Sequence, residues 1–89
     1  MMYPYMTLDD NTEIVHSEMK PDGTVKVYIE QAVDGGFHSA VCMLPAHEWS
    51  QIKGFTDSEM ERFKRLVRNN AHLILAFARD GGFANATVV

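Results

Sequence analysis

The feature that constrains the fold most is a predicted helix over residues 57–80, because the signals for both of its ends are present. Thr56 and Glu59 have the spacing of a capping box, in which the side chain of each residue bonds the backbone N–H of the other. At the far end, Gly81 and Gly82 can supply the left-handed residue that closes a helix. The sequence therefore predicts a single long helix over residues 57–80, followed by a short C-terminal tail.

Length and composition fit one globular domain. The chain has 89 residues, of which 46% are hydrophobic and 22% charged, and these values are typical of a folded domain. Its longest apolar run is far shorter than the roughly 20 residues of a membrane-spanning helix, and its first residues lack the pattern of a secretory signal. A single cysteine, Cys42, is typical of a reducing compartment. We therefore expect one cytoplasmic domain over residues 1–89.

The part of the chain before the helix has the pattern of a β-meander. Segments rich in apolar and β-branched residues lie at 3–8, 12–19, 24–33 and 37–44. Short turns of Asp, Asn, Pro and Gly separate them, so neighbouring segments should pair antiparallel. Pro45 can open and Gly54 can end a short helix over residues 46–53. The predicted fold is α+β: a three- to four-stranded antiparallel β-meander, then a short helix, then the long helix packed on the sheet.

Apolar side chains cover more of the long helix than one sheet face can bury. They span an arc of roughly 200°, whereas a helix on one sheet needs about 100°. Either the sheet and the short helix wrap around the surplus, or a second subunit packs on it. Asn70 falls inside the arc, and a buried amide needs hydrogen-bond partners. It would bond a sheet edge or the C-terminal tail, or it would pair with its own copy across a two-fold axis.

The segment at 37–44 adds to this surplus, because it is apolar on both faces. Val41 and Met43 lie on one face, whereas Cys42 and Leu44 lie on the other, which Tyr28 would join in the expected register. A sheet with one solvated face alternates more cleanly, and large exposed apolar patches mark interfaces. We therefore predict a homodimer, with an interface drawn from Phe63, Asn70, Leu73, Phe77 and Tyr28.

Charge is unevenly placed along the chain. Residues 1–56 hold three Lys and eight Asp or Glu, whereas residues 57–80 hold five Lys or Arg and four Asp or Glu. An acidic chain without a basic tract lacks the surface that nucleic-acid binding requires, so no nucleic-acid partner is expected. On the polar face of the helix, Arg65, Arg68 and Arg79 are either solvated or contact an acidic partner.

Side chains that could support catalysis are too far apart. Cys42 would need a base within hydrogen-bond reach, but His38, on the same strand face, should lie about 13 Å away. No spacing of Cys, His, Asp or Glu matches a metal site, and no Gly-rich loop matches a phosphate site. The sequence predicts no catalytic, cofactor-binding or metal-binding residues, and Cys42 should be a small buried core residue.

Two N-terminal segments carry a resemblance to other proteins. Residues 3–8 read Tyr-Pro-Tyr-Met-Thr-Leu, and residues 12–17 read Thr-Glu-Ile-Val-His-Ser. On these segments, and on shorter ones at 44–49, 54–56 and 70–73, the chain resembles a group of small uncharacterised proteins from gut bacteria. The resemblance implies a bacterial, cytosolic, stand-alone domain. It implies no activity, cofactor or catalytic residue.

Two functions from different classes fit these patterns. The first is a protein-interaction or regulatory domain that self-associates. The second is an acidic inhibitor, of the antitoxin or anti-defence kind, that presents carboxylates to a nucleic-acid-processing enzyme. These carboxylates lie largely at strand ends and turns: Asp9, Asp10, Glu13, Glu18, Asp22, Glu30 and Asp34. The patterns favour a small enzyme least.

Overall fold

The computed structural model describes residues 2–8 and 11–80. Within them the chain forms five strands and one helix, in the order β1 (Met2–Thr7), β2 (Thr12–Ser17), β3 (Val25–Val33), β4 (Gly36–Leu44), β5 (Glu48–Lys53) and α1 (Asp57–Arg79). The strands form one antiparallel sheet in sequence order, β1-β2-β3-β4-β5. The α+β class and the meander are therefore confirmed, with five strands in place of three or four.

Strand β5 replaces the short helix that was predicted over residues 46–53, and that prediction was wrong. His47 has a φ of 59° and Gln51 a φ of 51°, values that a right-handed helix cannot contain. Residues 48–53 become a strand because they pair with β4 and so satisfy the backbone hydrogen-bonding groups on the side of β4 that β3 leaves unpaired. Trp49 lies opposite Cys42 in this pairing. A non-local partner thus overrode the local pattern that begins at Pro45.

Helix α1 begins as the sequence predicts. The Thr56 N–H donates to Glu59 Oε1 at 2.8 Å, and the Glu59 N–H donates to Thr56 Oγ1 at 3.2 Å, which completes the capping box. The helix ends at Arg79, within one residue of the predicted end. The pair Gly81-Gly82, which was predicted to close it, lies outside the described residues. The Met19 N–H donates to the Ala78 carbonyl at 3.3 Å and ties the last turn to the chain after β2.

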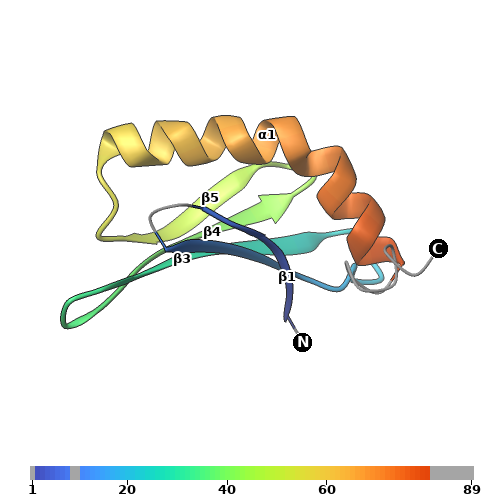
Figure 1. Ribbon diagram of the computed structural model, residues 1–89. Coiled ribbons are helices and arrows are strands. Elements are labelled where there is room, and N and C mark those ends of the chain that lie inside the picture. The colour runs from blue at the N-terminus through green and yellow to red at the C-terminus, as the bar shows by residue number, and fades with distance from the viewer. Residues whose placement is uncertain (1, 9–10, 81–89) are drawn as a thin grey trace.

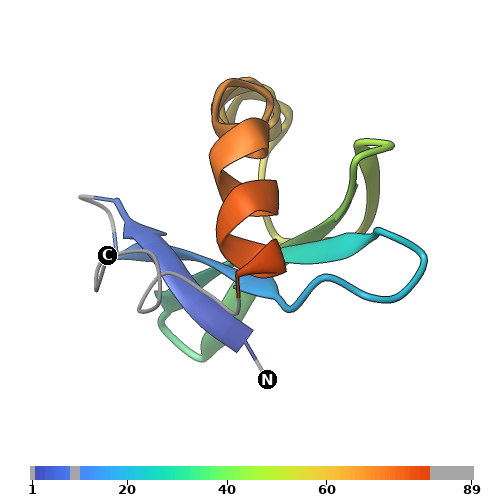
Figure 2. The same ribbon diagram turned by 90° about the vertical axis from the view of Figure 1, so that its right-hand side faces the viewer.

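One face of the sheet and one side of α1 share a single cluster of buried apolar side chains. The helix lies over this face, with β1 on one side of it and β5 on the other (Figures 1 and 2). The members with less than 1% exposure are Ile14, Val25, Val27, Ile29, Ala40, Cys42, Leu44, Val67 and Ile74. They follow the period of two along β2, β3 and β4 and the helical period along α1.

Tyr28 lies on the face of the sheet that points away from the cluster. It pairs with Val41, so it shares a face with Val41 and Met43 and not with Cys42 and Leu44. The expected register was wrong in this respect, because a shift of one residue moves a side chain to the opposite face.

Both edges of the sheet are irregular. In β1, the pairing with β2 shifts between Pro4 and Met6. In β5, the pairing with β4 shifts between the partners of Ser39 and Val41, where Gln51 adopts its positive φ. Pro and bulges at a sheet edge interrupt the row of backbone groups that another strand would need.

Candidate functional site

The surface residues that the sequence singles out do not form one site. Phe63 is 1% exposed and fills the core, and its ring contacts that of Phe55 at a centroid distance of 4.7 Å. Tyr28 lies on the opposite face of the sheet. The remaining interface candidates, Asn70, Leu73 and Phe77, gather on the side of α1 that faces β1. We call this side the β1 flank and the opposite side, which faces strand β5, the β5 flank.

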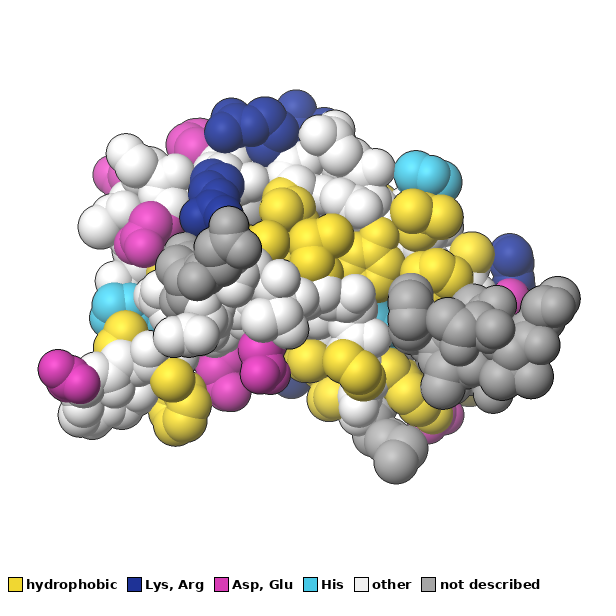
Figure 3. Space-filling model, in the orientation of Figure 1, with side chains coloured by type: hydrophobic (Ala, Val, Ile, Leu, Met, Phe, Trp, Pro, Cys, Tyr) yellow, Lys and Arg dark blue, Asp and Glu magenta, His cyan; other side chains and the backbone are white. Residues whose placement is uncertain are grey.

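The β1 flank is built around a line of side chains on α1. Leu66, Asn70, Leu73 and Phe77 follow the spacing i, i+4, i+7, i+11, which places them along one stripe of the helix. Leu73 is 40% exposed, and the other three are half-buried. Figure 3 shows hydrophobic side chains gathered along this side of the molecule, between the helix and the sheet edge. The stripe is therefore apolar surface that the sheet does not fully cover.

Tyr5 of strand β1 anchors the edge strand to this stripe. Its hydroxyl donates to Asn70 Oδ1 at 2.7 Å, and its ring lies 5.9 Å from the Phe77 ring between centroids. Burial raises the pKa of Tyr5 above its usual value, which further favours the protonated hydroxyl that donates this bond.

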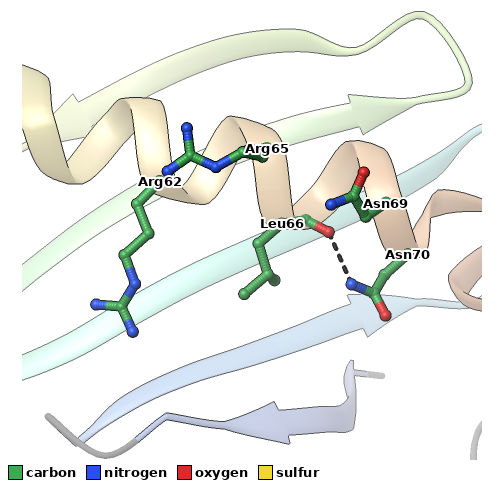
Figure 4. A pocket seen from close by; sticks show the side chains of 5 residues that line it. All are labelled: Arg62, Arg65, Leu66, Asn69 and Asn70. Carbon is green, nitrogen blue, oxygen red and sulfur yellow. Dashed lines mark hydrogen bonds between the residues drawn. The ribbon is translucent and has the colours of Figure 1, made fainter.

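The side-chain oxygen and nitrogen of Asn70 both form hydrogen bonds within the chain. Besides accepting from Tyr5, it donates from Nδ2 to the Leu66 carbonyl at 2.8 Å (Figure 4). Of the two alternatives for this residue, the bond to a sheet edge is the one that forms. Asn70 therefore needs no second copy to satisfy its hydrogen-bonding groups.

A basic hollow lies at the N-terminal end of the β1 flank. It has a volume of about 300 Å³ and is lined by Arg62, Arg65, Leu66, Asn69 and Asn70 (Figure 4). All five belong to α1, and the two guanidinium groups border the apolar stripe. The chemistry of this flank thus changes along the helix from cationic to apolar.

A second basic hollow lies on the β5 flank. It has a volume of about 350 Å³ and is lined by His47, Trp49, Lys64 and Arg68. Two segments that are distant in sequence meet here, the start of β5 and the middle of α1. The sequence prediction missed this site, because it assigned Trp49 to a helix. In the strand that forms, Trp49 lies opposite Cys42 and so shares a face with the β4 core residues.

The three arginines that were expected either to be solvated or to contact an acidic partner are separated in space. Arg65 lines the hollow of the β1 flank, and Arg68 lines the hollow of the β5 flank. Arg79 is exposed in the last turn of α1. They therefore do not form one continuous surface.

No family model, curated protein or solved structure matches this chain. We therefore infer its function from the geometry of its surfaces. Within the described residues, no helix combines the length and the apolar character that a membrane crossing requires.

Cys42 has the environment of a core residue. Its side chain is fully buried, and burial raises the pKa of the thiol from 9.0 to about 11. The thiol is therefore protonated at neutral pH, and a protonated thiol is a poor nucleophile. His38 packs edge-on against Phe55, with 5.6 Å between ring centroids.

Proposed function

We propose that this protein is a cytoplasmic protein-interaction domain that self-associates through the β1 flank of α1. The observation that carries the proposal is the apolar stripe of Leu66, Leu73 and Phe77, which lies beside Tyr5 and remains partly exposed. Exposed apolar surface of this kind is typical of interfaces. The cytoplasmic location is supported by the single cysteine, Cys42, whose thiol is free.

The interrupted sheet edges support a contact through the helix. Neither edge of the sheet favours the addition of a further strand. Strand β1 is interrupted by Pro4 and the register shift that follows it, and β5 by its register shift and the positive φ of Gln51. The β1 flank then offers an apolar contact surface that is available without changing the fold.

A two-fold axis fits the arrangement of the stripe. If two α1 helices pack antiparallel with the axis near Asn69, Leu66 of one copy lies against Leu73 of the other. Arg62 then lies near the Phe77 ring of the second copy, where a cation–π contact is favourable. Two-fold pairing through the same surface on both copies is the commonest form of oligomer.

Sedimentation equilibrium of the intact chain tests the proposal across roughly 1–100 micromolar, the concentration range in which a modest interface forms. We expect a mass of about twice 10.1 kDa at the upper end, and Leu73→Asp should give the monomer. Ile52→Asp is the matched control, because Ile52 is 47% exposed and lies on β5. It should leave the dimer intact. A 10.1 kDa species throughout, or equal effects of both substitutions, would overturn the proposal.

An acidic inhibitor is the second candidate, and one observation favours it. Glu13 and Glu30 lie directly opposite each other on β2 and β3, on the face away from the core. Like charges in such a pair destabilise a sheet, and a basic partner would relieve that repulsion. The test is capture of a basic nuclease from bacterial lysate by the natural chain. This function would be supported if the natural chain captures the nuclease and the double variant Glu13→Gln, Glu30→Gln does not. Equal capture by both chains would show that these two carboxylates do not bind the partner.

A further inference from the structure

We propose that the hollow of the β5 flank binds a small aromatic phosphate ester, with the ring against Trp49 and the phosphate between Lys64 and Arg68. This site is separate from the β1 flank, because it lies on the other side of α1. It therefore goes beyond the proposed self-association.

The walls of the hollow come from two elements whose positions are fixed by the core. Trp49 lies opposite Cys42 in the sheet and packs against the buried cluster, so its ring is held in place. Lys64 and Arg68 lie one helical turn apart, and each follows a buried residue of α1, Phe63 or Val67. The volume of about 350 Å³ is at the small end of the range for ligand pockets, roughly 300–1,000 Å³.

The charges around the hollow favour a phosphate over a carboxylate. Lys64 and Arg68 are like charges at i, i+4, a spacing at which they repel each other. A phosphate monoester can carry close to two negative charges at neutral pH, which matches this set better than the single charge of a carboxylate. Among the described residues that line the hollow, none is acidic. The neighbouring carboxylates, Glu48 and Glu61, are exposed and do not line it.

Trp49 gives the hollow its preference for a flat ring. Aromatic side chains bind planar groups by stacking, and the contact tolerates many ring types. The hollow on the β1 flank also holds two cations, Arg62 and Arg65, but its apolar member is Leu66. A ligand that needs both a ring and two cations should therefore distinguish the two hollows.

Trp49 is the single tryptophan of the chain, so its fluorescence reports binding directly. We expect phenyl phosphate to change this fluorescence in a saturable way at low ionic strength. Inorganic phosphate, which lacks the ring, and benzyl alcohol, which lacks the charge, should each bind more weakly. Phenylacetate should also bind more weakly than phenyl phosphate, since it carries only one charge.

Two substitutions and a control complete the test. Lys64→Gln and Arg68→Gln should each raise the Kd for phenyl phosphate at least roughly tenfold, as expected for loss of a hydrogen bond to a charged group. Arg65→Gln is the control, because Arg65 belongs to the other hollow, and it should leave the Kd unchanged. Amide chemical shifts of Trp49 and Lys64 provide a readout independent of fluorescence. No saturable change, equal weakening by Arg65→Gln, or tighter binding of phenylacetate would overturn the proposal.

Discussion

The two flanks of α1 differ although one helix supplies both. On the β1 flank the helix contributes Leu66, Leu73 and Phe77, and the one amide in the stripe, Asn70, is occupied within the chain. On the β5 flank it contributes cations beside an aromatic ring. The edge strand next to each flank sets the difference, because Tyr5 brings a hydroxyl to Asn70 whereas Trp49 brings an apolar ring. A helix that lies over a sheet with two open edges can thus present two unrelated surfaces.

The largest expected effect comes from removing the support that both flanks share. Phe63→Ala should lower the free energy of unfolding by about 3–5 kcal/mol, because it leaves a cavity under the N-terminal half of the helix. Phe37→Ala is the control, since Phe37 is 59% exposed, and it should change the free energy of unfolding by less than about 0.5 kcal/mol. Urea denaturation measures both. Equal losses would mean that the helix does not rest on Phe63.

A change of pH should act on the buried core that lies under both flanks. The Cys42 thiol holds its proton up to a pKa of about 11 in the folded state, against 9.0 in its unperturbed state. Between these values the unfolded chain binds fewer protons, so the free energy of unfolding falls as pH rises through this window, by roughly 2 kcal/mol in total. Below pH 9 the thiol is protonated in both states, so its titration has no effect there.

Cys42→Ala isolates this effect from the titration of other groups. The difference in free energy of unfolding between the natural chain and this variant should narrow with rising pH over that window. A constant difference would show that the thiol is not desolvated.

The smallest expected effect concerns the β1 flank alone. Tyr5→Phe removes the donor to Asn70 Oδ1 and should lower the free energy of unfolding by about 1 kcal/mol, the typical contribution of one hydrogen bond. Tyr3→Phe is a matched control, because the Tyr3 hydroxyl bonds Glu18 on the exposed surface at 3.2 Å. Chemical denaturation should show a smaller change for Tyr3→Phe. A larger change at Tyr3 would contradict the assigned role of Asn70.

The features that the sequence predicts correctly are those that depend on near neighbours along the chain. The capping box of Thr56 and Glu59 spans three residues, and the alternation of Val25, Val27 and Ile29 needs only the period of a strand. The features that failed depend on distant partners. Strand β5 forms because β4 has a free edge, and nothing within residues 46–53 encodes that edge.

The candidate sites follow the same division. Helical spacing alone brought Asn70, Leu73 and Phe77 together. It could not show that Phe63 is buried in the core, because the spacing of apolar residues does not tell which part of a wide arc faces the sheet and which part lies at its edge. The hollow of the β5 flank could not be predicted from the sequence, since Trp49 and Arg68 become neighbours only when β5 pairs with β4.

The interruptions at both edges of the sheet also limit how large an assembly of this chain can become. Regular edge strands can recruit copy after copy, and fibrils grow in this way. With β1 shifted at Pro4 and β5 shifted near Gln51, this open-ended growth is disfavoured at either side. Contact through the β1 flank would instead occupy the same surface on both copies, so a growing complex would terminate at two. We expect the chain not to form fibrils in concentrated solution, despite the apolar side chains on its surface.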